Sequence, residues 1–287
     1  MSTLSLTIIT ATYNAAATLR HSLDSVATQQ MGRKGDSPFT KRDCPLGFEH
    51  LLIDGGSTDG TLEIARQYPH ITRIVSEPDR GIYDAMNKGL RLATGEIIGI
   101  LNADDFYADG RVLERVAKVF EDPTVEACYG DLVYVQETGM RHEARGNGET
   151  QTPITNHHSP DFKILRYWQS GSFTPDKFKW GWMPPHPSFF VRRTVYERFG
   201  LFKLDLGSAA DYELMLRFLL KHRIKTAYIP EVLVCMRAGG VSNASLNNRL
   251  KANQMDRKAW EVNGLKPYPW TLLCKPLRKV PQYFLRP

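Results

Sequence analysis

The chain has 287 residues and a formal net charge of +6, and 42% of its residues are hydrophobic and 24% charged, which excludes disorder as its main state. No stretch approaches the roughly eighteen apolar residues that span a bilayer, and no early segment resembles a signal peptide, so we expect a cytoplasmic protein. The four cysteines are far apart and form no CxxC pair, which predicts free thiols rather than a zinc site or disulfides.

The chain begins with an apolar run at residues 4–9, which predicts a strand, and a helical pattern follows after a short loop. The first loop of an α/β sheet faces the ligand edge, so three of its side chains could hold a nucleoside base: Thr10, Tyr13 and Asn14. The alternative for Tyr13 is that the ring only covers the end of the sheet. Residues 29–48 lose the pattern and predict a loop.

Two further strands are predicted over residues 50–53 and 72–76, with a helix over residues 61–68 between them. Asp54, at the tip of the first strand, could accept a hydrogen bond from a base imide or a ribose hydroxyl, and the glycines after it permit close approach of a ligand. Asp79 and Arg80 follow the second strand, where a forked guanidinium could hold a nucleotide or diphosphate. The alternative is that part of this polar set is plain surface.

The most informative stretch is the apolar run at residues 97–101, which ends in Asn102, Ala103, Asp104 and Asp105. Such a run predicts a fully buried parallel strand, whose carboxyl end is where open α/β sheets bind ligands. Two adjacent carboxylates there suit Mg²⁺ or Mn²⁺, together with the phosphates of a substrate. The alternative is that either acid only caps the helix after Gly110.

A helix over residues 112–120 and a strand over 125–135 continue the alternation of strands and helices. This order predicts an α/β fold with a mostly parallel, Rossmann-like sheet and helices on both faces. There is no GxGxxG after the first strand and no GxxxxGK[ST] anywhere, which argues against a dehydrogenase and a P-loop kinase.

Residues 136–185 are irregular and rich in aromatic side chains, and we interpret them as facing an acceptor. His186 comes next, just before a short strand, and is either a donor at the ligand edge or a structural histidine. Asp211 lies in the first turn of a strongly apolar helix. It is either a general base that accepts a proton from a hydroxyl nucleophile or an acid that only serves the helix dipole.

Two short strands are predicted over residues 226–229 and 232–236, and a polar helix over 246–260. Gly239 and Gly240, after the second strand, could close over phosphates with their backbone amides, or form a plain turn.

The last segment of the chain is basic and aromatic. Residues 262–287 contain no acidic residue and alternate aromatic and leucine side chains with five basic ones, which are Lys266, Lys275, Arg278, Lys279 and Arg286. This mixture suits the anionic headgroup layer of a membrane, and the alternative is a solvated tail that packs a few aromatics on its own domain. Nucleic acid is not expected as a partner, although the charge alone would permit it.

Several separated motifs resemble those of one family. They are Thr10-x-x-Tyr13-Asn14, the run from Asp54 to Thr61, the run from Ser76 to Gly89, the Asn102–Asp105 tip, His186, Asp211-Tyr212 and Gly239-Gly-Val-Ser242. Over residues 4–245 they resemble family 2 glycosyltransferases of the GT-A fold. The run from Ser76 to Gly89 is similar to the subgroup that builds bacterial exopolysaccharide units of the colanic-acid type.

The resemblance implies a GT-A nucleotide-diphospho-sugar transferase domain over residues 1–245, with a nucleotide-sugar half at 1–135 and an acceptor half at 136–245. A basic amphipathic helix and tail follow at 246–287. It also implies that the nucleotide sugar is held by Thr10, Tyr13, Asn14, Asp54, Asp79, Arg80, Asn102 and Asp104. Asp105, with Asp104, would hold Mn²⁺ or Mg²⁺, Asp211 would be the catalytic base, and His186, Gly239 and Gly240 would lie on the acceptor or diphosphate side.

Three positions depart from the family's pattern. The acid that usually opens the metal motif is Asn102, the acid that often precedes the base is Ala210, and the glutamine that usually follows the histidine is Pro187.

The implied reaction is the inverting transfer of a sugar from a UDP- or GDP-linked donor to a hydroxyl of a glycan acceptor. The acceptor would be a lipid-linked polysaccharide repeat unit, and the tail would touch the cytoplasmic face of the membrane. One alternative is a sugar nucleotidyltransferase, which normally has a glycine-rich basic loop after the first strand, and none is seen here. The other alternative is a non-catalytic, membrane-associated scaffold that binds a nucleotide sugar.

Overall fold

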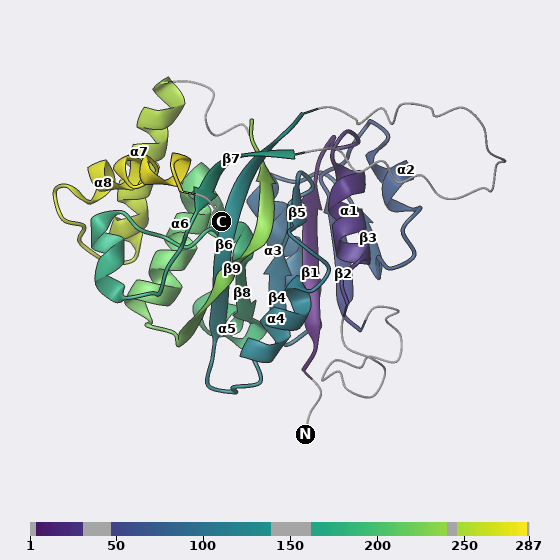
Figure 1. Cartoon of the computed structure of the whole chain (residues 1–287), viewed down its shortest axis with the longest axis horizontal. Helices are drawn as coiled ribbons and strands as arrows, with labels where there is room; N and C mark the ends of the chain where they lie inside the picture. Colours follow the sequence, from purple (N-terminus) through teal and green to yellow (C-terminus); the bar gives the residue numbers. More distant parts are fainter. Residues whose placement is uncertain (1–3, 31–46, 139–161, 240–245, 286) are drawn as a thin grey trace.

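The computed structural model describes residues 4–30, 47–138, 162–239, 246–285 and 287. Its centre is one nine-stranded sheet in the order β3-β2-β1-β4-β8-β6-β9-β5, with β7 beside β6 (Figure 1). The strands are β1 Leu6–Thr12, β2 Glu49–Asp54, β3 Arg73–Ser76, β4 Ile97–Ile100, β5 Asp105–Tyr107, β6 Ala127–Glu137, β7 Phe162–Trp168, β8 Phe189–Arg192 and β9 Thr226–Arg237.

Helices cover both faces of this sheet. They are α1 Leu19–Ala27, α2 Thr61–Ala65, α3 Ile82–Leu92, α4 Val112–Val119, α5 Arg193–Phe199, α6 Ala210–Met215, α7 Leu246–Val262 and α8 Thr271–Leu277. Short 3₁₀ turns precede β8 and α6, and α6 continues as a π-helical segment over Leu216–Lys221. The predicted α/β class is therefore confirmed.

The sheet is parallel in its first half and mixed in its second. β1 pairs in parallel with β2 and β4, and β2 pairs in parallel with β3. β8 then runs antiparallel to β4 and to β6, whereas β6 and β9 are parallel. The carboxyl ends of β1, β2 and β4 therefore meet at one edge, as the sequence pattern predicts.

Successive residues of the parallel strands enter different cores, which explains why these strands have apolar side chains on both faces. Ile9 packs in the cluster that contains residues of α3, α5, α6 and α7, while its neighbour Ile8 packs in the cluster that contains residues of α4. In β2, Leu51 belongs to the first cluster and Leu52 to a third one beneath α1 and α2. A strand buried on both faces has no polar face to reveal its period of two.

Four predicted boundaries are corrected. The first strand is predicted to end at residue 9 but continues to Thr12. The threonine-rich residues 10–12 pair with β2 just as the apolar residues before them do. α2 ends at Ala65 rather than near residue 68. The irregular region contains the strand β7. The two strands predicted after residue 225 are one strand, β9, because a register shift against β6 accommodates Pro230.

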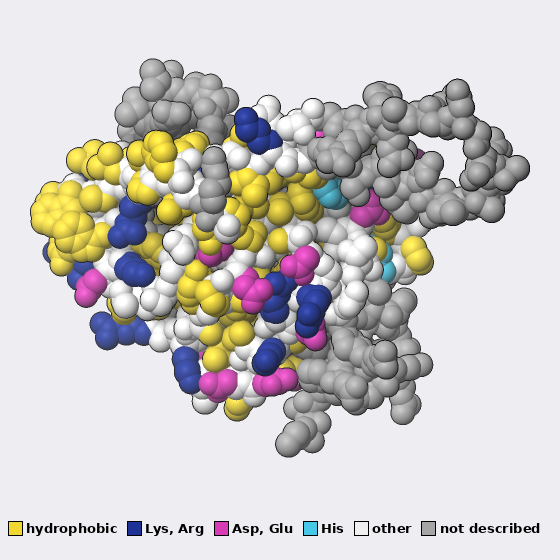
Figure 2. Space-filling view, viewed as in Figure 1, with side chains coloured by type: hydrophobic (Ala, Val, Ile, Leu, Met, Phe, Trp, Pro, Cys, Tyr) yellow, Lys and Arg dark blue, Asp and Glu magenta, His cyan; other side chains and the backbone are white. Residues whose placement is uncertain are grey.

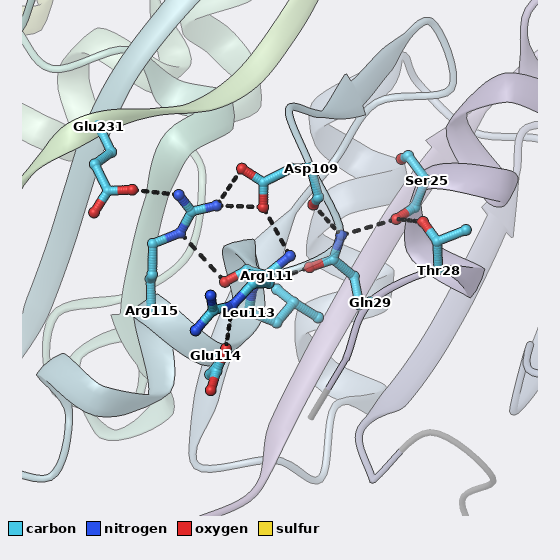
Figure 3. A network of polar contacts seen from close by, with 9 residues as sticks. All are labelled: Ser25, Thr28, Gln29, Asp109, Arg111, Leu113, Glu114, Arg115 and Glu231. Carbon is cyan, nitrogen blue, oxygen red and sulfur yellow. Dashed lines mark hydrogen bonds and ion pairs between the residues drawn. The ribbon is translucent and has the colours of Figure 1, made fainter. Parts of the chain in front are cut away.

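The sequence pattern also misses the three-residue strand β5, and a polar network holds the loop that follows it (Figure 3). The amide of Gln29 donates to the Asp109 carbonyl (2.7 Å) and accepts from the Leu113 backbone amide (3.0 Å). Arg115 of α4 binds Asp109 on one side and Glu231 of β9 on the other. The network ties α1, α4 and β9 together around the loop that follows Asp105–Tyr107.

The C-terminal helices pack on α6 and on the segment around Lys179. Ala259 and Trp260 of α7 are buried in the main core, and the Trp260 indole donates to the Tyr212 hydroxyl (3.0 Å). α8 is anchored by Thr271, which donates to the Lys179 carbonyl (2.6 Å), and by an ion pair between Lys275 and Asp256 (2.7 Å). The division at residue 245 stays a prediction.

The outer side of this C-terminal region is apolar. In Figure 2, hydrophobic side chains gather at the left of the view, where Figure 1 places α8, with Lys and Arg side chains beside them. We call the exposed members the tail patch: Trp270, Leu273, Leu277, Val280, Tyr283, Phe284 and Leu285. No helix among the described residues has the length and apolarity to cross a membrane.

Candidate active site

The loops after β1 and β2 are locked together at the edge where the parallel strands end. Asn14 adopts a left-handed conformation (φ 47°), its backbone amide donates to the Ser57 hydroxyl (2.8 Å), and its side-chain oxygen accepts from the Thr58 amide (3.0 Å). Tyr13, next to it, leaves 63% of its surface exposed. We call this region the donor edge, because four of the predicted nucleoside residues meet there.

Asp54 organises the donor edge from below. Its carboxylate is buried and accepts from the amides of Gly56 and Ser57 (3.1 and 2.9 Å) and from the hydroxyls of Ser57 and Ser76. Four donors satisfy the carboxylate, three of them in the loop after β2 and one at the end of β3, so Asp54 shapes the loop. A direct contact between Asp54 and a nucleoside stays a prediction.

Gly55 lets Tyr13 and Asp79 converge. A Cβ atom on residue 55 would stand 2.6 Å from Asp79 Oδ2 and 3.3 Å from a ring carbon of Tyr13. Arg80, in contrast, turns outward and pairs at the surface with Asp84 (3.4 Å), with 78% of its side chain exposed. Tyr13 and Asp79 could therefore flank a bound base, while the predicted diphosphate contact of Arg80 would require its side chain to leave Asp84.

Thr10 does not reach the donor edge, contrary to prediction. It lies inside β1, two residues before the strand ends, and is fully buried. Its hydroxyl lies 3.0 Å from the Nε2 atom of the buried His50 side chain. The reason for the error is the strand boundary, since β1 runs to Thr12 rather than stopping before Thr10.

Asp105 is fully buried at the start of β5, whereas Asp104, just before it, is half-buried. The amide nitrogen of Asn102 donates to Asp105 Oδ2 (3.1 Å). Burial, and second the charge of Asp104, raise the pKa of the Asp105 carboxyl well above its usual range. The sequence predicted both acids in a loop beyond the strand, and instead only Asp104 lies outside a strand.

Two oxygen atoms at this strand end have no partner although they are buried: Asn102 Oδ1 and Asp105 Oδ1. These two oxygens and the carboxylate of Asp104 form a set of oxygen ligands that suits a hard divalent cation. Among the described residues, no group of three or more His, Cys, Asp or Glu side chains could hold a metal. A cation on a diphosphate needs only one or two carboxylates, because phosphate oxygens and water fill its other positions.

Asp211 is placed by a turn that only glycine makes easily. Gly207 has a positive φ (φ 49°, ψ −128°) within the 3₁₀ turn Leu204–Ala209. Helix α6 begins directly after this turn, at Ala210. A buried ion pair between Glu213 and Arg217 (2.9 Å) fixes the helix, and Arg217 also binds the carbonyls that follow α5. Asp211 is therefore held on a rigid element.

His186 and Tyr83 lie close to Asp211. Burial lowers the pKa of the His186 imidazole, and the Asp211 charge opposes this. Burial, and then the same carboxylate, raise the pKa of the Tyr83 phenol well above its usual range. The structure thus brings the predicted His186 and Asp211 together, and it adds a tyrosine from α3 that the sequence did not single out.

A cavity of about 860 Å³ opens beside Asp211, and we call it the acceptor cavity. Its walls include Asp211, Gly239, residues of β6, β7 and β9, and residues of α8 and the tail patch. Gly240, predicted with Gly239, lies outside the described residues. None of the described residues predicted to hold the nucleotide lines this cavity, so the two groups of side chains occupy separate places.

Tyr134 of β6 connects the two places. It lines the acceptor cavity, and the charges of both Asp105 and Asp211 act on its phenol, whose pKa is raised first by burial. Asp105 and Asp211 therefore both lie close enough to Tyr134 for their charges to act on its phenol.

Sequence reasoning misses Tyr83, Tyr134 and Arg166, which all lie near Asp211 or line its cavity. A weak signal for Arg166 exists, because residues 162–168 are rich in the aromatic and β-branched side chains that strands favour, but the irregular segments on both sides hide it. Tyr83 and Tyr134 come close to Asp211 only through the tertiary fold.

The comparisons with known proteins identify the family. The model for "Glycosyl transferase family 2" matches residues 7–197. A "PGL/p-HBAD biosynthesis glycosyltransferase" of Mycobacterium tuberculosis is 31% identical over 242 residues, which cover 82% of this chain and 78% of that protein. The glycosyltransferase YibD of Escherichia coli is 32% identical over 143 residues, covering 48% of this chain and 37% of that one.

Two solved structures share the fold. The mannosyltransferase PcManGT from Pyrobaculum calidifontis, in complex with GDP-Man and Mn²⁺, superposes with a TM-score of 0.59 at 21% identity, covering 94% of this chain and 68% of that one. S. aureus TarS superposes with a TM-score of 0.57 at 18% identity, and its match covers 89% of this chain but only 43% of that chain. The chain therefore belongs to glycosyl transferase family 2 and has the α/β GT-A fold, which makes it a transferase of glycosyl groups.

Proposed function

We propose that this chain transfers a hexosyl group, with inversion at the anomeric carbon, from a UDP- or GDP-linked sugar to a hydroxyl of a lipid-linked glycan. The observation that carries the proposal is the position of Asp211, which lines the acceptor cavity while the charges of Asp211 and Asp105 both act on Tyr134. A general base and a diphosphate site close to one another suit a reaction between two substrates.

The nucleotide sugar would bind with its nucleobase between Tyr13 and Asp79 and with its diphosphate at the strand end. Asn102, Asp104 and Asp105 would hold Mn²⁺ or Mg²⁺ there, and the two unpartnered buried oxygens support this assignment. The cation supplies a Lewis acid that offsets the charge developing on the departing diphosphate. Solved proteins of this fold include one with GDP-Man and Mn²⁺ and one with UDP-GlcNAc, so neither base is preferred.

Asp211 would accept the proton of the acceptor hydroxyl as the oxygen attacks the anomeric carbon. His186 and Tyr83, beside it, would orient the carboxylate and the hydroxyl. Among the described residues that line the cavity, Asp211 is the only acid. A single carboxylate suits one direct displacement, which inverts the configuration, whereas a double displacement needs a second nucleophile.

The lipid-linked acceptor and the contact with the cytoplasmic face of a membrane rest on the tail patch. Leu277, Tyr283 and Leu285 are exposed and also line the acceptor cavity. Aromatic and aliphatic side chains beside Lys275 and Arg278 suit the interface of an anionic bilayer. A lipid chain that stays in the membrane could therefore present its glycan directly to Asp211. The role in exopolysaccharide synthesis stays a prediction.

The experiment is an incubation of the purified chain with UDP- and GDP-sugars, Mn²⁺ and a lipid-linked acceptor. Release of UDP or GDP is expected. Release of pyrophosphate from a sugar phosphate and a nucleoside triphosphate would instead indicate a nucleotidyltransferase. No turnover of any donor would indicate a scaffold. Calorimetry with the nucleotide tests the cation site separately. Asp105→Ala should lose the part of the affinity that depends on Mn²⁺ and keep the metal-independent part.

A further inference from the structure

Arg166 of β7 lies in the wall of the acceptor cavity as a buried cation. It is 7% exposed, and its guanidinium carbon lies 3.7 Å from the centroid of the Tyr134 ring and 5.8 Å from those of Trp168 and Tyr283. Among the described residues, no Asp or Glu forms an ion pair with it. The aromatic faces offset part of the cost of burying this charge, but they leave its forked donors without an anion.

Other cations in the same wall have carboxylate partners. Lys275 pairs with Asp256 (2.7 Å), and Arg237 pairs with Glu137 (2.9 Å). Arg166 therefore differs from these two, because it is buried and yet has no carboxylate partner among the described residues. A buried guanidinium that opens to a cavity is the side chain that most favours a planar, bidentate anion such as phosphate.

Basic side chains also outnumber acidic ones in the lining of the cavity. Among its described lining residues, Asp211 is the only acid, whereas five are basic: Arg166, Arg237, Lys275, Arg278 and Lys279. Clefts lined by one sign of charge concentrate ligands of the opposite sign. The described residues of the donor edge and the strand end are not part of this lining, although Met236 in the wall pairs with Asp105, so we assign the anion to the second substrate rather than to the sugar donor.

We infer that the acceptor is anionic and that Arg166 binds a phosphate or diphosphate group that it carries. The inference rests on the proposed function, since it names the chemical class of the substrate that brings the attacking hydroxyl. Tyr134, Trp168 and Tyr283 hold the guanidinium in place from several sides, which prepares it for two parallel hydrogen bonds. Such a group occurs both in lipid-linked carriers and in free phosphorylated glycans.

The test is calorimetric titration of the full chain with farnesyl diphosphate and with inorganic pyrophosphate, in EDTA so that no divalent cation can bring them to the strand end. The wild-type chain should bind at least one probe. Arg166→Gln should weaken that binding about tenfold or more, and Arg166→Lys, which keeps the charge, should weaken it less. Arg91→Gln, an exposed arginine of α3 outside the cavity, should change nothing.

Equal affinities of the wild-type chain and Arg166→Gln would overturn the inference, as would the absence of binding of both probes. Tighter binding of farnesyl diphosphate than of pyrophosphate assigns the site to a lipid-linked group, and equal binding assigns it to a free phosphorylated glycan. A thermal melt of each variant without ligand checks folding, and the Arg166→Gln chain should lose only the stabilisation that the probe adds. Donor turnover by the wild-type chain, measured apart in Mn²⁺, tests the proposed function, so the two ideas can fail separately.

Discussion

Gly55 and Asp79 meet at the donor edge with no room for a methyl group between them. A Cβ atom at residue 55 would lie 2.6 Å from the Oδ2 atom of Asp79, well inside van der Waals contact. The Asp79 side chain, which also accepts from the Gly81 amide (2.8 Å), would have to turn away. The position of Asp79 relative to Tyr13 therefore requires glycine at residue 55.

Gly55→Ala should consequently weaken nucleotide binding while leaving the fold intact. Because the displaced group is the end of a side chain, we expect a loss of about one hydrogen bond, or roughly tenfold in Kd, as measured by calorimetry with UDP or GDP and Mn²⁺. Gly60→Ala is the matched control, since its nearest neighbour would be the Cβ of Ala16 at 3.9 Å. Equal losses in the two variants would show that the Asp79 contact is unimportant.

Replacing Asp211 by Asn should separate chemistry from binding. The amide keeps the shape but cannot take a proton, so turnover should fall by about 10² to 10⁴ while the Kd for the nucleotide stays the same. Asp205→Asn is the control, because this exposed carboxylate of the preceding turn pairs with Lys258 at the surface. Initial rates of nucleotide release give the comparison. An Asp211→Asn chain with full turnover would remove this residue from the role of base.

The sequence predicts the elements that are locally encoded and misses those that depend on distant contacts. The apolar strands at residues 50–53 and 97–101 were predictable because burial on both faces makes every position apolar. β5 was not, because three residues that pair only with β9 leave no periodic pattern.

The same limit applies to the site. Asp54, Asp79 and Asp211 follow recognisable strand or helix ends, so their approximate places could be predicted. Their contacts could not, since the four donors around Asp54 come from the loop after β2 and from the end of β3. The pairing of Thr10 with His50 likewise joins residues forty positions apart, and no local sequence pattern predicts it.

His50 should make the fold sensitive to mild acid. Burial, and second the neighbouring His70, lower the pKa of this imidazole to about 3. The unfolded chain binds a proton near pH 6.5 and the folded chain does not, so stability is complete above that pH and is lost as the pH falls toward 3. This group alone should cost about 2 kcal/mol in the free energy of unfolding between pH 7 and pH 5.

Urea denaturation of the wild-type chain and His50→Gln at the two pH values measures this effect. The variant should be less stable at pH 7, because the Thr10 hydroxyl loses its partner, but the difference between the two pH values should shrink. His222→Gln, which removes an exposed imidazole, should keep most of the difference. An unchanged pH difference in His50→Gln would mean that His50 is already protonated in the folded chain or stays neutral in both states.

The tail patch should bind anionic membranes through its apolar side chains. Leu273 and Leu277 are both more than 60% exposed on α8, so replacing both by Glu should leave the fold intact. The double variant loses apolar contact and adds repulsion from anionic lipid, and we expect its affinity for vesicles of phosphatidylglycerol and phosphatidylcholine to fall about tenfold or more. Ile82→Glu is the control, because this leucine-sized side chain is also exposed but lies on α3. Sedimentation with the vesicles at low and high salt gives the readout, and equal pelleting of all three chains would assign the patch a different partner.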